Sequence, residues 1–500
     1  MAGDKNLGPY ILDRSVYINR GCSEHLGNKR NYKILTREGA LNRQQGLIIQ
    51  LRNFISRYGP REDYREPVDY TCISKAEDTY LRCAVKKYAD KLAKFRMTAK
   101  IHKNPWKMRP IVCCTGTMMN SWSKWLNYWL QKLKHLIPTY IKDSQQVLDE
   151  IKTIELPPNA KLFTCDANSM YNNIDTEHAI TVISWWLKDM DEKEQLPANF
   201  PLEAVIHAMK IIMRNNIFEW GDLFFLQLIG TAMGTSAAVM WATLYYAYHE
   251  VHTLIPVHGQ LLLYFKRFID DILGIWIGNT TTEWESFRND VDNFGILTWD
   301  IKQQKLTTSV NFLDLTLTIR GGTIISSTYQ KAMNLYLYLP FASAHPQGCI
   351  KGTVHSLIRR YYAQNSFRED YINIVSLFYR RICARGWDPS FIRDLIVEAS
   401  RRIENAPPKL PPSYESKQIA DEIYIHLQYN PEDITRRQVR LLYDEHLANH
   451  FSNTLGVKRA IVTYSRPKSI GDYVTQAKLH QAPGNTASTI MGEYELGLNP

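Results

Sequence analysis

No stretch of the sequence is apolar over the length needed to cross a membrane, and residues Met1–Arg20 are too polar and charged for a secretory signal peptide. The eight cysteines include no Cys-x-x-Cys pair, so we expect neither a zinc site nor a disulfide framework. Internal repeats are also lacking. These absences argue against a membrane-spanning or disulfide-rich secreted protein, and we expect an intracellular chain with reduced thiols.

What the sequence does contain is a large apolar fraction and an excess of positive charge. Its 500 residues are 45% hydrophobic and 12% aromatic, which allows two or more domains with a sizeable core. Lys and Arg outnumber Asp and Glu by 60 to 50, and the segment Lys75–Lys142 alone holds 15 basic residues against 3 acidic ones. Such a segment is typical of proteins that bind nucleic-acid phosphates, although many basic proteins bind none.

Two adjacent carboxylates, Asp270 and Asp271, lie in Tyr264–Trp276 between an apolar run and a β-rich run. The pattern predicts a strand, a tight turn and a second strand, with the acids at the tip. Burying two adjacent like charges is costly unless a cation compensates them, and Mg²⁺ typically takes one or two protein carboxylates plus substrate phosphates. The alternative is that Asp is simply common in hairpin turns.

A third carboxylate, Asp166, follows a short apolar run that predicts a strand, and the stretch His178–Leu187 then predicts a helix. The three acids could converge on two metal ions, which stabilise both oxygens of an in-line phosphoryl transfer. Taken alone, an Asp in the position of Asp166 is more often a helix-flanking cap than a metal ligand. Between the acids, Gly230 and Gly234 predict a loop that a backbone or base can approach closely, or an ordinary turn before a buried helix.

Three motifs in this order resemble the palm of a reverse transcriptase: Asp166-x-x-x-x-Tyr171, Gly230-x-x-Met233-Gly234 and Phe268-Ile-Asp-Asp271. The flanking sequence is similar to the Penelope-like retroelement type, which is related to telomerase reverse transcriptase, over roughly residues 95–480. The flanking segments that carry this similarity are Ala99–Lys103, Met108–Val112, Val310–Leu317, Tyr329–Lys331, Ser343–Pro346 and Tyr464–Asp472.

The sequence departs from this family at three places. Ala237-Ala238 follow Thr235-Ser236, whereas the family commonly has Ser-Pro after Met-Gly, so the shape of the loop and its effect on activity stay open. Phe268 replaces the usual Tyr and keeps the ring without the hydroxyl. Many relatives carry a GIY-YIG endonuclease, which is lacking here, so we expect no self-contained DNA cleavage.

The resemblance implies an α+β fold of the right-hand polymerase kind, with an antiparallel palm sheet that bears the catalytic hairpin and a small C-terminal α/β extension. The implied parts are an N-terminal extension 1–70, fingers 71–159, palm 160–328, a thumb-like helical region 329–405, a proline-rich linker 406–419, a C-terminal extension 420–480 and a tail 481–500.

Local patterns predict a helix over Leu41–Tyr58 with a cap near Asn42, helical structure over Ala76–Ala99 and a strand over Pro110–Cys114. Trp122, Trp125 and Trp129 recur at helical spacing. Such a stripe is more often core than a base-stacking platform.

The implied activity is RNA-directed DNA polymerisation, in which a primer 3′-hydroxyl attacks the α-phosphorus of a deoxynucleotide. Two Mg²⁺ ions, for which Mn²⁺ could substitute, would be held by the catalytic acids Asp166, Asp270 and Asp271. The implied nucleotide-binding residues are Lys100, Lys103, Arg109 and Tyr171, whose ring would clash with a ribose 2′-hydroxyl. The implied template and primer contacts are Gly230, Met233, Gly234, Phe268, Phe312 and Leu313.

Expected partners are an RNA template, a DNA primer or RNA–DNA hybrid and deoxynucleotides, which implies action in the nucleus. Two other functions stay open: a domesticated nucleic-acid-binding protein with weak or no polymerase activity, and an RNA-dependent RNA polymerase. The three acids argue against the first alternative, and Tyr171 argues against the second. The RNA copied, the priming route and the oligomeric state are not readable from the sequence.

Overall fold

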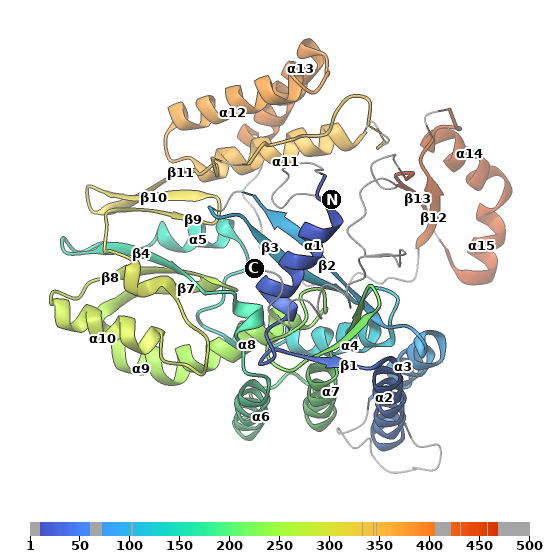
Figure 1. Cartoon of the computed structure of the whole chain (residues 1–500). Coiled ribbons are helices and arrows are strands. Elements are labelled where there is room, and N and C mark those ends of the chain that lie inside the picture. The colour runs from blue at the N-terminus through green and yellow to red at the C-terminus, as the bar shows by residue number, and fades with distance from the viewer. Residues whose placement is uncertain are drawn as a thin grey trace. The chain divides into compact units, whose positions relative to one another are not determined.

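The computed structural model describes residues 11–60, 73–101, 104–332, 334–343, 345–346, 348–405, 422–430, 432–457 and 459–468 (Figure 1). These residues form two compact units, one up to residue 332 and one from 334 onward. The fold is α+β, as expected. In these described ranges no helix combines the length and the apolar character that a membrane span requires.

The first unit mixes helices with three antiparallel or mostly antiparallel sheets. Its helices are α1 Arg14–Gly21, α2 Arg37–Tyr58, α3 Lys75–Tyr88, α4 Met118–Gln131, α5 Ser144–Ile151, α6 Thr176–Glu192, α7 Leu202–Arg214, α8 Ala238–His249, α9 Ile255–His258 and α10 Thr281–Val291. Its strands are β1 Tyr32–Leu35, β2 Ala93–Lys100, β3 Lys107–Cys113, β4 Lys161–Asp166, β5 Ile217–Trp220, β6 Leu223–Gln227, β7 Leu262–Phe268, β8 Asp271–Trp276, β9 Ser309–Phe312, β10 Leu315–Arg320 and β11 Thr323–Thr328.

One sheet has the order β4-β8-β7 and is antiparallel throughout. The strand, turn and strand predicted around Asp270 and Asp271 are present as β7 and β8, and the strand predicted before Asp166 is β4. A second sheet of order β1-β6-β5-β2-β3 brings a strand from the start of the chain beside β6. A third, β11-β10-β9, follows the hairpin in the chain.

One local prediction in the first unit was wrong, and another was correct except at its start. Residues 93–100, which were expected to be helical, form the strand β2. In this strand buried Phe95 and Met97 alternate with exposed Lys94 and Arg96. This alternation has the period of a strand, and pairing with β3 fixes it. The helix predicted from Leu41 begins earlier as α2, because the Thr36 side chain accepts a hydrogen bond from the backbone of Gly39.

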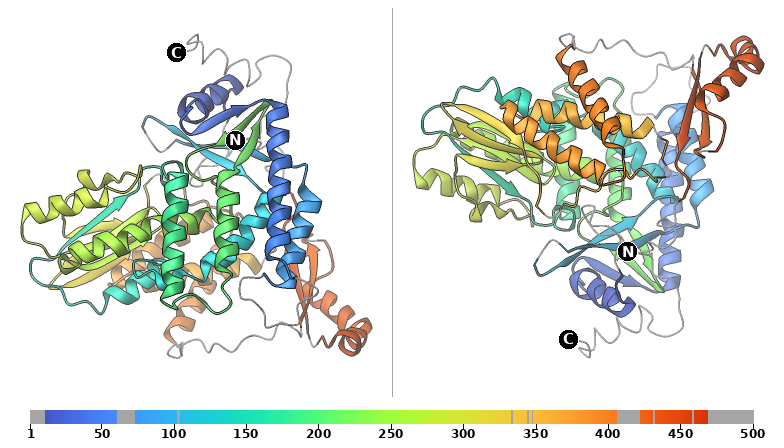
Figure 2. Two further views of the ribbon diagram at one scale, coloured as in Figure 1. Left: turned by 90° about the horizontal axis from the view of Figure 1, so that it is seen from below. Right: turned by 90° about the horizontal axis from the view of Figure 1, so that it is seen from above.

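The tryptophan stripe of α4 lies in the main hydrophobic core, which confirms it as packing rather than a stacking platform. Trp122, Trp125 and Trp129 are all buried. The indole N–H groups of Trp125 and Trp129 both donate to Glu77 Oε1, each at 2.8 Å. Glu77 thus connects α3 to α4. In the same unit, the helices α2, α6 and α7 lie side by side (Figures 1 and 2).

The second unit contains α11 Gly348–Gln364, α12 Arg368–Cys383, α13 Pro389–Glu404, β12 Glu422–Gln428, α14 Arg436–His446, α15 Ala448–Leu455 and β13 Arg459–Ser465. The helices α11, α12 and α13 all lie within residues 329–405, the region expected to be helical. The strands β12 and β13 pair in parallel. The predicted proline-rich linker 406–419 lies outside the described residues, and the boundaries of fingers, palm and thumb stay predictions.

Candidate active site

Three carboxylates meet at one end of the β4-β8-β7 sheet. Asp166 is the last residue of β4 and Asp271 the first of β8, and the two are directly opposite each other in the register. Their carboxyl groups are within hydrogen-bonding reach of each other. Asp270, in the turn before β8, lies near enough to act electrostatically on both. Sheet pairing therefore brings together acids that lie about a hundred residues apart in the chain.

The crowding of these acids shifts their proton affinities. Desolvation, followed by the hydrogen bond and charge of Asp166 and the charge of Asp270, raises the pKa of Asp271 to about 8. Asp270 is exposed at the surface, yet protein surrounds enough of its carboxyl that desolvation, together with Asp166, raises its pKa. Lys331, from the Tyr329–Lys331 motif, opposes the rise at Asp271. The site therefore holds carboxylate charge that the neighbouring protein cations do not fully offset.

Such a surplus of carboxylate charge suits a hard divalent cation, which binds through oxygen. Among the residues that the structure describes, however, no group of three or more His, Cys, Asp and Glu side chains is arranged as a ready set of ligands. The three acids therefore suit a divalent cation by the type of their donor atoms and by their charge, and not by a ready ligand geometry.

A fourth carboxylate, Asp300, was not predicted and supports Asp166. Its Oδ1 accepts a hydrogen bond of 2.7 Å from the backbone N–H of Asp166, and its Oδ2 accepts one of 2.9 Å from Gln304 Nε2. Desolvation, with a contribution from the charge of Asp166, raises the pKa of Asp300. The residue lies in a short 3₁₀ turn, Asp300–Gln303, and no local sequence pattern marks it.

The turn between β7 and β8 presents Asp270 and Asp271 through a constrained backbone. Ile269 has a φ of 58°, a left-handed conformation that is unusual for a β-branched residue. Two hydrogen bonds hold the turn: Ala167 N–H donates to the Asp270 carbonyl at 2.8 Å, and Arg267 Nη1 donates to the Ile269 carbonyl at 2.8 Å. The turn is thus fastened both to the end of β4 and to a buried guanidinium.

Arg267 belongs to a buried ion pair behind this turn. Its side chain is 2% exposed and that of Glu250 is 0% exposed, with Nε 2.5 Å from Oε1 and Nη2 3.0 Å from Oε2. Arg267 Nη2 also donates to the Thr243 carbonyl at 2.9 Å, and Thr139 Oγ1 donates to Glu250. A buried pair is tolerated when its remaining hydrogen-bonding groups are satisfied, as they are here.

The loop containing Gly230 and Gly234 is clamped between two backbone segments. The φ angles of the two glycines are 84° and 127°, and an added Cβ would lie 2.3 Å from the Tyr171 carbonyl oxygen at Gly230 and 2.1 Å from that of Val112 at Gly234. Thr231 N–H donates to the Tyr171 carbonyl at 2.7 Å, and Val112 N–H donates to the Met233 carbonyl at 2.8 Å. The expected close approach of a backbone is therefore present.

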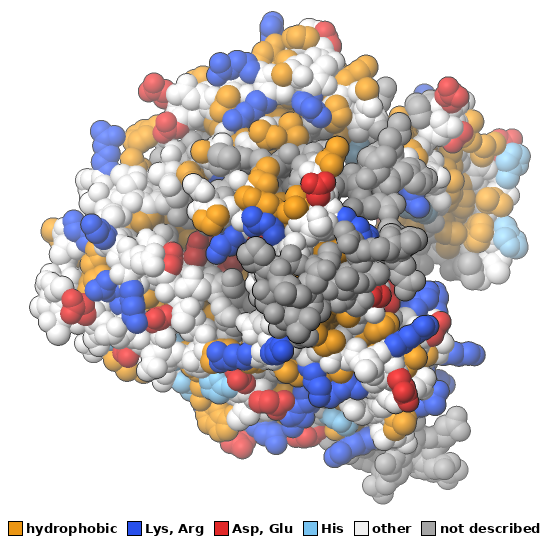
Figure 3. Space-filling view, in the orientation of Figure 1, with side chains coloured by type: hydrophobic (Ala, Val, Ile, Leu, Met, Phe, Trp, Pro, Cys, Tyr) orange, Lys and Arg blue, Asp and Glu red, His pale blue; other side chains and the backbone are white. Residues whose placement is uncertain are grey.

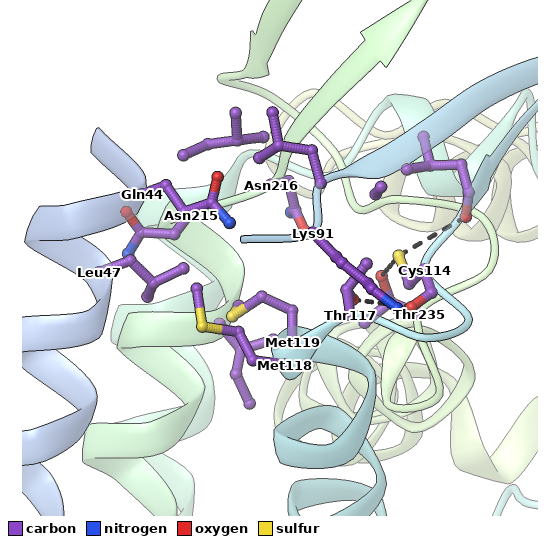
Figure 4. Close-up of a pocket in the computed structure, with 15 residues that line it drawn as sticks. Gln44, Leu47, Lys91, Cys114, Thr117, Met118, Met119, Asn215, Asn216 and Thr235 are labelled. Carbon is purple, nitrogen blue, oxygen red and sulfur yellow. Dashed lines mark hydrogen bonds between the residues drawn. The ribbon is translucent and has the colours of Figure 1, made fainter. Parts of the chain in front are cut away.

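The segment after this loop closes on the start of α4. Thr235 Oγ1 lies 3.6 Å from Cys114 Sγ, at the edge of a cavity of about 30 Å³ whose lining residues come from several elements (Figure 4). A cavity of this volume has room for about two water molecules and no more. The cavity is therefore a small packing defect and is too small to hold a nucleotide.

We expect Gly234→Ala to destabilise the chain by about 1–3 kcal/mol more than Gly116→Ala, because its Cβ would overlap the Val112 backbone. Gly116 is the matched control: its φ is also positive, at 79°, but nothing lies within 4 Å of an added Cβ. Urea unfolding of both variants gives the difference. Equal losses at the two positions would mean that the loop yields to the added methyl group.

Tyr171 and two cations interact electrostatically with Asp270. Tyr171 lies in a 3₁₀ turn, Met170–Asn172, and burial followed by the charge of Asp270 raises its pKa to about 12. Arg109 on β3 and Lys100 at the end of β2 both act on Asp270 and oppose the rise of its pKa. The predicted residues Lys100, Arg109 and Tyr171 therefore all interact electrostatically with Asp270, while Lys103 lies outside the described residues.

The residues predicted to contact the primer or template around Phe268 and Phe312 lie in or against an apolar core. Phe268 is opposite Asp271 in the hairpin and packs, half-buried, against the same apolar core as Leu313. Phe312 is 2% exposed within that core. Leu313, with a φ of 53°, follows β9. Core packing thus accounts for the Phe312 side chain, and the primer contacts expected of these residues stay predictions.

No family model and no curated protein matches the sequence. Among solved structures, telomerase from Candida albicans in complex with a TWJ fragment of telomeric RNA is 9% identical, with a TM-score of 0.44, over 70% of this chain and 68% of that chain. Apo telomerase from Candida tropicalis is 11% identical, with a TM-score of 0.38, over 62% of this chain and 61% of that one. A similarity of this degree transfers no residue role, so the function has to be argued from the site.

Proposed function

We propose that the chain is an RNA-directed DNA polymerase, which adds deoxynucleotides to a primer 3′-hydroxyl on an RNA template. The observation that supports this best is the meeting of Asp166, Asp270 and Asp271 at one end of an antiparallel sheet, with Arg109 and Lys100 acting electrostatically on Asp270. A binding protein without catalysis has no need of three crowded acids among cations. The Penelope-like motifs add a retroelement origin and action in the nucleus to the same proposal.

The three acids would hold two Mg²⁺ ions, or Mn²⁺ in their place. When bound, such ions lower the pKa of the attacking hydroxyl and neutralise charge that develops on the phosphate. The chain's own residues do the positioning: Asp300 fixes the backbone of Asp166, and the Ile269 turn fixes Asp270. Arg109 and Lys100 supply positive charge for a triphosphate, for which the Arg fork gives two directed hydrogen bonds and Lys a point charge.

The direct test is primer extension by the full chain on an RNA template with Mg²⁺ and deoxynucleotides. Template-dependent DNA products are the expected result. Tight binding of the hybrid without any extension, over a range of salt and metal, would instead support the nucleic-acid-binding alternative. Preferential incorporation of ribonucleotides would support the RNA polymerase alternative.

We expect Tyr171→Ala to relax the choice of sugar, because the ring next to Asp270 would clash with a 2′-hydroxyl. The preference for deoxynucleotides, measured as a ratio of kcat/KM values, should fall about tenfold or more, as for other pocket truncations. Tyr171→Phe keeps the ring and should keep the preference. An unchanged ratio in an active Tyr171→Ala chain would show that the ring does not face the sugar.

A further inference from the structure

A groove with a volume of about 650 Å³ lies in the first unit, and none of the three acids lines it. Its walls are α2, the first residues of α6, the end of α7 and the end of β6. The volume is that of a ligand pocket, but such pockets are usually lined by apolar and aromatic side chains. Here charged, amide and hydroxyl side chains predominate: Arg43, Gln50, Thr176, Glu177, His207, Lys210, Arg214, Asn215 and Gln227.

The groove carries a net positive charge. Three cationic side chains, Arg43, Lys210 and Arg214, face a single carboxylate, Glu177. Glu177 accepts two hydrogen bonds from Arg214, at 2.8 and 2.6 Å, and also interacts electrostatically with Lys210, so one carboxylate offsets only part of the charge of the three cations. In the space-filling view, Lys and Arg side chains gather, with acids among them, over the part of the surface where α6, α7 and α2 lie (Figure 3).

A histidine in the groove reports the same positive field. Desolvation lowers the pKa of His207, and the charges of Arg57 and Lys210 lower it further. No carboxylate acts on His207 strongly enough to oppose these two cations. Of these two cations, Lys210 lines the groove and Arg57 does not, so cations in and near the groove both act on His207.

One wall of the groove is continuous with the Gly230–Gly234 loop. Thr176 Oγ1 lies 3.1 Å from the Leu228 carbonyl and 3.3 Å from that of Gly230, to both of which it can donate. Gln227 Nε2 donates to the Ile229 carbonyl at 3.0 Å. The groove wall and the start of the glycine loop are therefore direct hydrogen-bonded neighbours in the fold.

We propose that this groove binds the phosphates of the single-stranded template outside the hybrid. The inference rests on the proposed function for the identity of the strand. Among the described residues that line the groove, the apolar side chains are the aliphatic Ile211, Leu226 and Leu228, and none is a Phe, Tyr or Trp on which bases stack. Cations and amides without such a platform bind the backbone, which gives affinity independent of sequence and sensitive to salt.

The test compares Arg43→Gln/Lys210→Gln with wild type in binding two RNA–DNA hybrids, one blunt and one with single-stranded RNA template tails. Fluorescence anisotropy over a salt series should show about tenfold weaker binding of the tailed hybrid. Its slope of log affinity against log salt should fall by about 1.4, the value for two phosphate contacts on a single strand. Affinity for the blunt hybrid should stay within about twofold, since both residues lie outside the candidate active site.

The matched control is Arg52→Gln/Lys188→Gln, which removes the same charge from α2 and α6 at positions outside the groove. Equal weakening by both double variants would overturn the proposal, because net charge alone would then explain the effect. Weakening of blunt and tailed hybrids alike by the groove variant would overturn it too. The binding assay does not require the chain to extend a primer. A wild type without extension activity would therefore refute the proposed polymerase function, while the comparison of binding affinities would remain valid.

Discussion

Asp270→Asn should abolish primer extension while leaving the affinity for an RNA–DNA hybrid unchanged. The Asn amide has the shape of the Asp carboxyl but no charge. The site would therefore compensate less of the positive charge of the metal ions proposed to bind to Asp166, Asp270 and Asp271. Several kcal/mol of charge stabilisation correspond to a rate loss of about 1,000-fold or more. Single-turnover extension with deoxynucleotides and Mg²⁺ measures the loss.

Asp300→Asn is the graded control for this experiment. Its amide oxygen can still accept the hydrogen bond from the Asp166 backbone, so we expect a loss of about tenfold, the equivalent of one weakened hydrogen bond. Hybrid affinity, measured with both variants, separates chemistry from binding. Extension by Asp270→Asn at the wild-type rate would remove Asp270 from the catalytic group and, with it, the main support for the polymerase proposal.

The three acids of this site could be predicted because each belongs to a local pattern. Asp270 and Asp271 lie at the tip of a hairpin whose strands are readable from apolar and β-branched runs, and Asp166 ends a short apolar strand. No local pattern, in contrast, predicts that the three acids converge in space. That β4 pairs with β8 follows from tertiary packing, and before the structure only the order of the motifs indicated it.

The residues that support the acids could not be predicted, for a physical reason. Asp300 acts by accepting one backbone N–H from a strand 134 residues away, and an isolated Asp in a polar stretch is also what a solvated turn contains. Arg267 and Glu250 look like ordinary charges in the sequence, because their burial and their contacts with Thr139 and Thr243 arise only in the fold. Sequence patterns predict groups that share an element, and these partners do not.

The error over Ala76–Ala99 has a related cause. Lys, Arg, Met and Ala favour helices, and they dominate residues 93–100, so propensity points away from the strand β2. The alternation of buried Phe95 and Met97 with exposed Lys94 and Arg96 is the stronger signal. Pairing with β3 decides the outcome, because it satisfies the backbone groups of both strands.

Arg267→Ala should destabilise the chain by about 3–5 kcal/mol, the usual result of leaving one partner of a buried ion pair uncompensated. Glu250 is 0% exposed and would keep the hydrogen bond from Thr139 but lose its cationic partner Arg267. Urea unfolding measures the loss. Lys193→Ala, which removes a surface pair with Asp189 on α6, is the control and should cost about 0.5 kcal/mol or less.

The double variant Arg267→Met/Glu250→Leu separates stability from positioning. Replacing both charges with apolar side chains of similar volume should restore most of the lost stability, because no buried charge is then left unpaired. It cannot restore the hydrogen bond from Arg267 Nη1 to the Ile269 carbonyl, so the left-handed turn before Asp270 loses one of its two fastenings. We therefore expect the refolded double variant to bind a hybrid normally and to extend it at least about tenfold more slowly. Recovery of the extension rate together with stability would mean that the pair only fills space, and that the bond from Ala167 to Asp270 is enough to hold the acids in place.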